Sequence, residues 1–549
     1  MSYLEKLNRF ADNPVNMNMK RTKFRRNHNN TITFNSGLLI PILFDEVLPD
    51  DSISLDVASV VRSITPAVPV MDNSFLDIYA FFVPNRLATV GDKDWQQICG
   101  ENINGFWANA TEYTLENTGN TCSMKSGSDT VQPQSLGDYL GLFPVGFNAG
   151  DTTQFSRLPL NGYMLIWDEF FRDENLQSPS SWKTYNDNNA RTGYKLASSV
   201  KPTCKLHDYF TSALPSLQKG ASVLLPMAGS APIKTSSSET VPYASGISAI
   251  KFNALDNTLP LGPAQIVSGG SLQTTSGTVV SGKSLYPTNL YADLALATAV
   301  SVNEMRQAFA LQKLLEKDAR GGTRYRSMLL THFGVQLPDL TAQVPEYLGG
   351  VRVPMNMLQV LQTAQGTSPV GTTGAFSNTS DSSHLFTKSF AEFGMLYVLA
   401  TVRTSQSYSQ GINKFALKKR RFDWYYPVFA NLGEQPIMES EIYADASTDW
   451  TEVFGYQEAW AEYRYKPNHV GGYCAAGSGD TVAQSWTYAN QFAAKPVLNS
   501  SFIVQPREQV DNTLVITNAT YQFIGNFYFD YRIWRAMPYF SIPGLIDHH

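Results

Sequence analysis

The side chains that could perform acid–base or metal chemistry are few and scattered in this chain. Seven histidines are spread over 549 residues. His207 precedes Asp208, which could orient an imidazole for base work, although a hydrogen-bonded structural histidine is the more frequent outcome for such a pair. His548 and His549 could hold a metal ion only weakly, because two ligands at a chain end make an incomplete site. These residues do not predict a catalytic or metal centre.

Two pairs of acidic residues, Asp168–Glu169 and Asp173–Glu174, could supply paired carboxylates. Arg172 lies beside them in a segment with a helical pattern, so we expect a solvated helix face. Gly477–Asp480 (GSGD) predicts a turn, because no Gly-Lys follows it. No Walker loop, GxSxG elbow, HExxH or EF-hand pattern is present. We therefore expect no enzymatic activity, no cofactor and no metal.

The composition suits a protein that makes many contacts. Charged residues are 16% of the chain and aromatic residues 12%, against about 25% charged residues in an average soluble protein. Either subunit interfaces bury this low-charge surface, or the chain is a β-rich protein with polar, uncharged loops. Four separated cysteines predict no disulfide scaffold. The first residues lack a signal peptide and no apolar run reaches 18 residues, so we expect cytoplasmic synthesis and no membrane insertion.

Positive charge is concentrated in two places. Residues 1–30 carry seven basic and two acidic residues, 7 − 2 = +5, although the whole chain has a net charge of −5. A second basic run comprises Lys414 and Lys418 to Arg421. Such clusters contact nucleic acid or are solvated tails. The acidity of the whole chain argues against a dedicated nucleic-acid-binding protein.

Strand patterns dominate the sequence. Ile53, Leu55 and Val57 alternate with polar residues, the period of a half-buried strand. Residues 75–83 and 394–402 are runs of apolar residues, and the second predicts a strand buried on both faces. Residues 521–534 place five aromatic residues on one face: Tyr521, Phe523, Phe527, Phe529 and Tyr531.

Two helices are predicted among these strands. Ser301 and Glu304 form a capping box before an apolar stripe, and Gly321–Gly322 supplies a stop. The second helix covers residues 162–175, with Met164, Trp167, Phe170 and Phe171 facing inward.

Residues 221–289 differ in composition from both flanks, since they consist mostly of Ser, Thr, Gly, Pro and small apolar residues. They predict a surface insertion. Two more long connections, 84–157 and 403–500, separate the strand blocks. We therefore expect one β-sandwich with elaborate insertions rather than several independent domains.

Several long motifs resemble, in the same order, those of the major capsid proteins of the gokushoviruses, small single-stranded DNA phages of the Microviridae. The motifs comprise residues 37–52 (GLLIPILFDEVLPDDS), 65–87, 160–177, 207–220 (HDYFTSALPSLQKG), 303–325 (NEMRQAFALQKLLEKDARGGTRY), 331–350 and 537–549. The chain departs from the family at KPTCKLHDYF, which has fewer basic residues before His207 than the family tends to carry.

The resemblance implies an all-β dominated fold: an eight-stranded antiparallel viral jelly roll, or β-sandwich, over residues 1–549, with large interstrand insertions and a few short helices. It further implies a T = 1 icosahedral shell of 60 copies, formed through pentamers, around circular single-stranded DNA. The implied partners are a small basic internal DNA-binding protein, a minor vertex or pilot protein and a host cell-surface receptor. The chain would assemble in the cytoplasm of a bacterial host and end in the virion.

The resemblance also implies roles for particular segments. Residues 1–36 would form a basic N-terminal arm, and residues 535–549 an extended C-terminal segment along the sandwich or a neighbour. The candidates for phosphate contacts at the inner surface are Lys20, Arg21, Lys23, Arg25 and Arg26, followed by Lys418, Lys419, Arg420 and Arg421. The alternative is that these cations pair with acidic groups of neighbouring subunits.

The insertion 221–289 would form a protrusion at the three-fold axis that contacts the host. Its candidate contact residues are Leu224, Leu225, Ile247, Ile250 and Phe252. A rival hypothesis is a secreted β-rich carbohydrate-binding or glycoside-hydrolysing protein, in which Trp and Tyr stack on sugar rings.

Overall fold

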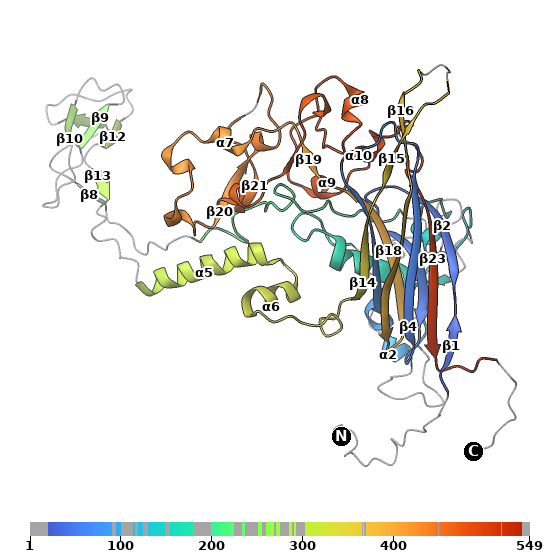
Figure 1. Cartoon of the computed structure of the whole chain (residues 1–549). Helices are drawn as coiled ribbons and strands as arrows, with labels where there is room; N and C mark the ends of the chain where they lie inside the picture. Colours follow the sequence, from blue (N-terminus) through green and yellow to red (C-terminus); the bar gives the residue numbers. More distant parts are fainter. Residues whose placement is uncertain are drawn as a thin grey trace, which may run out of the picture. The chain divides into compact units, whose positions relative to one another are not determined.

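Two antiparallel sheets surround the main hydrophobic core of the chain (Figure 1). The computed structural model describes residues 20–540 with gaps, the largest of which are 100–112, 183–198, 224–232, 236–250, 275–284 and 293–301. The first sheet contains, in spatial order, β1 (Thr22–Arg25) with β2 (His28–Phe34), β23 (Phe523–Arg535), β4 (Ser52–Ser63) and β17 (Thr379–Ser389). The second contains β14 (Glu346–Pro354), β5 (Ser74–Pro84), β18 (Gly394–Thr404) and β3 (Ile40–Val47). The strand-rich fold predicted from the sequence is confirmed.

The strand β23 shows why these residues form a sheet with one buried face. Phe523, Phe527, Phe529 and Tyr531 are completely or almost completely buried, while Ile524 and Tyr528 on the other face are exposed. β23 pairs with β4 from Phe523–Ser63 to Trp534–Ser52. The predicted alternation is confirmed from Phe523 onward, since side chains two residues apart share a face; Tyr521, predicted on the same face, precedes the strand and is half-buried.

The strand β18 is buried on both faces, as predicted. One face contributes to the core, and α4 (Leu158–Ile166) packs on β18 and β5. Gly162 allows this close approach, since a Cβ atom there would lie 2.4 Å from Tyr397 Oη. The same Tyr397 hydroxyl donates a hydrogen bond of 2.8 Å to the carbonyl of Pro159.

The predicted helix over 162–175 is correct in type but not in its bounds. It begins at Leu158, because Pro159 is tolerated in a first helical turn. It continues as a π-helical turn, η2 (Trp167–Phe171), and ends where Arg172 adopts an extended backbone. Met164 and Trp167 are buried as predicted, and Phe170 and Phe171 pack partly buried against the core.

The described residues of the connection between β5 and α4 form short elements. They are α1 (Asn85–Ala88), α2 (Trp95–Ile98), β6 (Thr121–Ser123), α3 (Leu136–Tyr139) and β7 (Gln154–Ser156). The hairpin of β15 (Met357–Leu361) and β16 (Thr373–Ser377) follows β14.

The connection between β18 and β23 packs on the segment around Tyr209 and Phe210 to form a smaller second core. Other members of this core include Ile437, Ile442 and Phe502. The strands of this connection are β19 (Ser407–Tyr408), β20 (Glu434–Met438), β21 (Val453–Glu458) and β22 (Asn468–His469). Its helices are α7 (Lys414–Leu417), the 3₁₀ turns η5 (Arg421–Asp423), η6 (Pro427–Phe429), η7 (Glu439–Glu441), η8 (Ala461–Tyr463) and η9 (Gly472–Cys474), and α8 (Thr481–Gln484), α9 (Ser500–Ile503) and α10 (Glu508–Asp511).

Residues 218–320 form a separate compact unit, wider than the predicted insertion 221–289. Its strands are β8 (Ile233–Thr235), β9 (Lys251–Ala254), β10 (Pro260–Val267), β11 (Ser271–Thr274), β12 (Leu285–Pro287) and β13 (Leu290–Ala292). Most of the predicted first helix, α5 (Val302–Gly321), belongs to this unit, and Gly322 with φ +88° ends it as predicted. A further helix, α6 (Tyr325–Phe333), follows in the larger unit.

Candidate functional site

The aspartate of the His207–Asp208 pair organises its own turn. Asp208 Oδ1 accepts hydrogen bonds from the backbone N–H groups of Phe210 and Thr211, at 3.1 and 2.8 Å, and from the Thr211 hydroxyl. His207 is exposed. The predicted turn at Gly477–Asp480 is confirmed, since Gly477 and Gly479 have φ near +82° and Asp480 caps α8.

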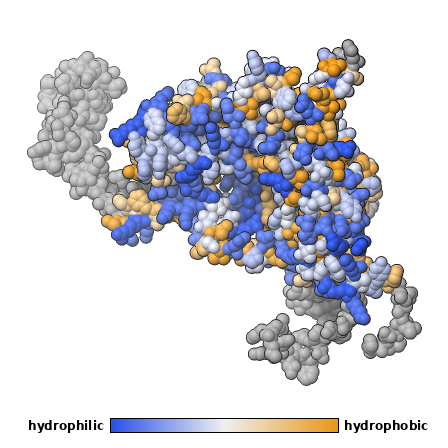
Figure 2. Space-filling model, in the orientation of Figure 1, coloured by the Kyte–Doolittle hydropathy of each residue, from blue (hydrophilic) through white to orange (hydrophobic). Residues whose placement is uncertain are grey.

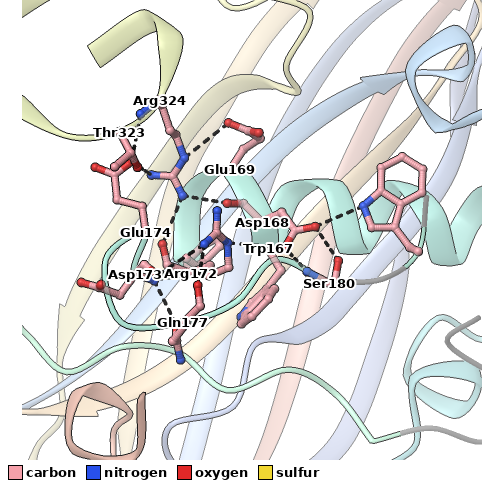
Figure 3. Close-up of polar contacts among 12 residues, drawn as sticks. Trp167, Asp168, Glu169, Arg172, Asp173, Glu174, Gln177, Ser180, Thr323 and Arg324 are labelled. Atoms are coloured by element: carbon pink, nitrogen blue, oxygen red, sulfur yellow. Dashed lines mark hydrogen bonds and ion pairs between the residues drawn. The ribbon is translucent and has the colours of Figure 1, made fainter. Parts of the chain in front are cut away.

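The acidic pairs 168–169 and 173–174 do not form the solvated helix face that the sequence predicted (Figure 3). Asp168 is buried; its carboxylate accepts a hydrogen bond of 2.9 Å from Ser180 N and one of 3.1 Å from Trp182 Nε1. Arg172 Nε lies 3.6 Å from Asp168 Oδ1. The prediction of a solvated face was wrong for Asp168 because the segment after the helix folds back and places Ser180 and Trp182 against its carboxylate.

Arg324 completes this acidic cluster from a segment 150 residues away. Its guanidinium lies 3.5 Å from Glu169 and 3.7 Å from Glu174, and it donates to the carbonyl of Asp168 at 2.7 Å (Figure 3). Burial lowers the pKa of Arg324, while Glu174 and Glu169 raise it in part. Three of the four carboxylates therefore have arginine partners, and the cluster joins η2 and the residues after it to the start of α6 instead of offering a catalytic pair.

The basic N-terminal residues lie in the first sheet from Thr22 onward, so this part of the predicted arm 1–36 is strand. The chain pairs with β23 from Thr22–Arg535 to Phe34–Phe523, interrupted around Arg26. Phe34 is fully buried. Residues 1–19 lie outside the described residues.

The five candidate cations of this segment fall into two groups. Arg21 pairs with Asp50 at 3.3 Å, and Arg26 pairs with Asp45. Lys20, Lys23 and Arg25 are exposed and have no ion pair within the described part of the chain. Lys23 lies over the Trp534 ring, 4.8 Å from its centroid. Only the second group keeps its charge free for a ligand.

The second basic cluster lies between α7 and η5. Lys418 is bound within the chain, because its Nζ donates to Glu462 at 2.9 Å and to the Tyr463 hydroxyl at 3.0 Å. Lys419, Arg420 and Arg421 are exposed. Figure 1 shows α7 and β1 far apart in the larger unit, so the fold does not join the two basic clusters into one surface.

The candidate contact residues of the insertion are largely outside the described residues. This holds for Leu224, Leu225, Ile247 and Ile250. Phe252 lies in β9, whose backbone pairs with β10 and β12. Of the C-terminal segment 535–549, residues 541–549 are also outside; Tyr539 stacks on Phe24 of β1 with a centroid distance of 5.9 Å.

The sequence did not identify two groups of exposed apolar side chains. On the loop around α7 and η5, Phe415 is 72%, Phe422 68% and Val428 89% exposed. The β15–β16 hairpin exposes Leu358, Val360, Leu361 and Phe376, where orange residues gather in Figure 2. The basic run of 418–421 followed directly by an aromatic-rich run in 422–429 (KKRRFDWYYPVF) was a usable signal. Monomeric soluble proteins rarely expose so much apolar area, so these surfaces indicate contacts with other molecules.

Among the residues that the structure describes, no three His, Cys, Asp or Glu side chains are arranged to hold a metal ion. All four cysteines are free thiols. None of the helices with described residues is both long and apolar enough to cross a membrane.

Comparisons with known proteins give one consistent result. Residues 14–545 match the family model described as capsid protein (F protein). The chain is 36% identical over 547 residues to capsid protein VP1 of Bdellovibrio phage phiMH2K, covering 97% of both chains. It is 34% identical to capsid protein VP1 of Chlamydia phage 1, with 98% of both chains covered. For capsid protein VP1 of Spiroplasma virus 4 the identity is 33%, over 96% of this chain and 95% of the relative. The chain therefore belongs to the phage F capsid protein family of the Microviridae.

Proposed function

We propose that this protein is the major capsid protein of a T = 1 icosahedral shell of 60 copies that encloses circular single-stranded DNA. The observation that carries the proposal is the family match over residues 14–545, together with identities of 33–36% over nearly the full length of three capsid proteins. Closed symmetry lets one chain reuse the same contact surfaces throughout a shell. The carbohydrate-binding hypothesis has no support from these relatives.

The strand order supports an eight-stranded jelly roll as the shell-forming fold. β1 and β2 pair with the same strand, β23, and count as one interrupted strand. In chain order, the first, eighth, third and sixth strands then form one sheet, and the second, seventh, fourth and fifth the other. This order is that of two nested Greek keys, which define the jelly roll.

The exposed apolar surfaces would be buried between copies in the shell. Val302, Met305 and Phe309 lie on one face of α5, at helical spacings of three and four residues, and are exposed in the single chain. Phe415, Phe422 and the β15–β16 hairpin add further apolar area. Assembly interfaces are enriched in aromatic residues and Arg.

Assembly tests the proposal directly. Purified protein should form pentamers and closed particles, measured by light scattering and electron microscopy, whereas a stable 60.8 kDa monomer under all conditions would overturn it. The double variant Phe415→Ser/Phe422→Ser should keep the unfolding midpoint of the subunit and lose particle yield. Asn431→Ser, an exposed polar position nearby, is the matched control and should assemble normally.

Host attachment through the insertion is the second part of the proposal. Residues 218–320 form their own compact unit, which supports a module that can vary without disturbing the sandwich. Replacing 221–289 by the corresponding segment of another phage should change the host range and leave assembly intact. An unchanged host range would contradict the attachment role.

The remaining partners follow from the same function. The packaged DNA, a small basic internal protein, a minor vertex or pilot protein and a host receptor are proposed partners, and assembly is proposed to occur in the bacterial cytoplasm. Mass spectrometry of purified particles tests the protein partners.

A further inference from the structure

One face of α5 combines apolar side chains with cations. Residues three or four apart lie on the same face of a helix, and they form here a single stripe, the α5 stripe: Val302, Arg306, Phe309, Lys313 and Lys317. All five are exposed, Val302 at 66% and Phe309 at 63%. The three cations have no ion pair with any residue that the structure describes. A partner that fits the α5 stripe therefore carries negative charge beside apolar side chains.

The segment from η7 to the start of β21 has the opposite charge. Residues 439–453 contain five acidic residues and no basic residue. In the loop 449–453, Asp449 precedes Trp450 and Glu452 precedes Val453, and all four are exposed. The exposed fraction is 54% for Trp450 and 42% for Val453. This loop thus offers carboxylates next to apolar side chains, the chemistry that the α5 stripe requires.

The loop 449–453 is held in shape but carries an excess of negative charge. Asp449 Oδ1 accepts hydrogen bonds from the backbone N–H and the hydroxyl of Thr451, at 2.9 and 2.7 Å. Among the described residues, Lys495 is the cation that pairs with this segment, 2.7 Å from Glu452 and 3.8 Å from Glu439. Burial and the neighbouring Glu452 raise the pKa of Glu439. One lysine therefore does not offset the carboxylates gathered there.

A second copy of the chain can bring the two surfaces together. In an assembly of identical copies, one surface can bind a different surface of the next copy, and such head-to-tail contacts close into rings. Opposite charges then select the partner, and the apolar side chains between them are buried. A contact between two α5 stripes is disfavoured, because it would place cations opposite cations.

We propose that the α5 stripe of one copy binds the loop 449–453 of a neighbouring copy, with Lys313 and Lys317 facing its carboxylates and Phe309 packing on Trp450. This contact rests on the proposed shell, because it needs a second copy. It gives α5 a specific partner among the exposed surfaces of the chain.

Carbodiimide cross-linking of assembled particles tests the contact, because the reagent joins a lysine directly to a carboxylate that touches it. The particles are assembled from an equal mixture of unlabelled subunits and subunits labelled with a heavy nitrogen isotope. Mass spectrometry should find peptides in which Lys313 or Lys317 is joined to Asp449 or Glu452. Half of these peptides should combine a light and a heavy chain, which is possible only between copies.

Neutral substitutions measure the contribution of the charges. Lys313→Gln/Lys317→Gln should lower the yield of particles about tenfold at physiological salt, because two interfacial ion pairs are lost. The unfolding midpoint of the subunit should not change, since both side chains are exposed. Asn303→Glu/Gln307→Glu is the matched control: it changes the charge of α5 by the same −2, at exposed positions outside the stripe. This control should assemble normally.

A charge swap tests whether the two surfaces meet. Lys313→Glu/Lys317→Glu should prevent assembly, and adding Asp449→Lys/Glu452→Lys to the same chain should restore it, because every copy supplies both surfaces. Glu452 also pairs with Lys495. If Glu452→Lys lowers the unfolding midpoint, Asp449→Lys alone provides the swap and should restore part of the yield.

Several results would overturn the contact. They are particles without mixed light and heavy cross-links between the α5 stripe and the loop 449–453, no recovery of assembly by the charge swap, and equal losses of yield for the neutral variant and its control. Particles of the neutral variant that form in normal yield but hold less DNA would place the stripe against DNA and also overturn it. If the wild type forms no particles at all, the proposed shell itself is contradicted.

Discussion

The guanidinium group of Arg535 binds the fully buried carboxylate of Asp51 at two points. Arg535 Nη2 lies 2.6 Å from Asp51 Oδ2, and Arg535 Nε lies 2.9 Å from Asp51 Oδ1. Asp51 also accepts a hydrogen bond from Leu48 N. The pair joins the C-terminal end of β23 to the turn before β4. It therefore holds together two neighbouring strands that come from opposite ends of the sequence.

Replacing Arg535 by Gln should destabilise the subunit strongly. The substitution leaves a buried carboxylate without its cation, which costs about 3–5 kcal/mol. Arg464→Gln is the matched control, because Arg464 and its partner Glu458 are 47% and 40% exposed and such surface pairs contribute at most about 1 kcal/mol. Urea unfolding of purified subunits measures both. Similar losses for the two variants would contradict a special role for Arg535.

Gly162→Ala should destabilise the contact between α4 and β18. The new methyl group would lie 2.4 Å from Tyr397 Oη and 3.0 Å from its ring carbon Cζ, and overpacking of this kind costs about 1–3 kcal/mol. Tyr397→Phe removes the hydroxyl and its hydrogen bond to Pro159. The double variant should lose less free energy of unfolding than the two single variants lose together, because the phenylalanine relieves part of the clash. Strict additivity in urea unfolding would mean that the helix shifts freely.

The strands that were predicted correctly are those whose pattern is local. β23 and β18 carry their alternation or apolar run in consecutive residues, and each is buried accordingly. β1 and β2 were predicted as part of a basic arm, since the charges of 20–26 obscured Phe24, Ile32 and Phe34. Their strand form depends on pairing with β23, about 500 residues away.

The site residues were harder to predict for the same reason. Which cations remain free depends on Asp45 and Asp50, and the acidic cluster depends on Arg324. None of these pairings is a short-range pattern. Exposure of an apolar surface likewise follows only once the packing of the whole chain is known.

Because of Lys205, the free energy of unfolding of the subunit should increase as the pH rises above neutrality. Burial lowers its pKa from 10.5 to about 8, an effect that Asp208 opposes in part; its Nζ lies 3.3 Å from Asn490 Oδ1. Between these two pKa values the unfolded chain binds more protons than the folded chain, so the free energy of unfolding increases with pH.

Urea unfolding of the wild type and Lys205→Met, from about pH 7 to about pH 9.5, measures this contribution as a difference. The variant should show a smaller increase, and Lys313→Met, at an exposed position on α5, should match the wild type. The comparison stays below the ordinary tyrosine pKa, because burial raises the pKa of Tyr397 and Tyr408 and their effect has the opposite sign at higher pH. Parallel curves for wild type and Lys205→Met would contradict the prediction.

The two groups of N-terminal cations should differ in their effect on single-stranded DNA binding. Lys20, Lys23 and Arg25 have no ion pair with any residue that the structure describes, whereas Arg21 and Arg26 are bound to Asp50 and Asp45. The triple variant Lys20→Gln/Lys23→Gln/Arg25→Gln should weaken binding of oligothymidylate and reduce the slope of log K against log salt by about 2, at roughly 0.7 per phosphate contact. Filter binding at several salt concentrations measures the slope.

Arg21→Gln/Arg26→Gln is the internal control for that measurement. It removes fewer charges, and both are already neutralised within the chain, so it should lower the stability of the subunit and change the salt slope by less than the triple variant. Lys419→Gln/Arg420→Gln/Arg421→Gln tests the other basic cluster in the same assay. Lys418 is left unchanged in this variant because it is engaged with Glu462, whereas the other three cations are exposed. If this variant alone reduces the slope, the phosphate contacts lie on the loop from α7 to η5. If only the N-terminal triple variant does, β1 and the residues just before it carry the contacts.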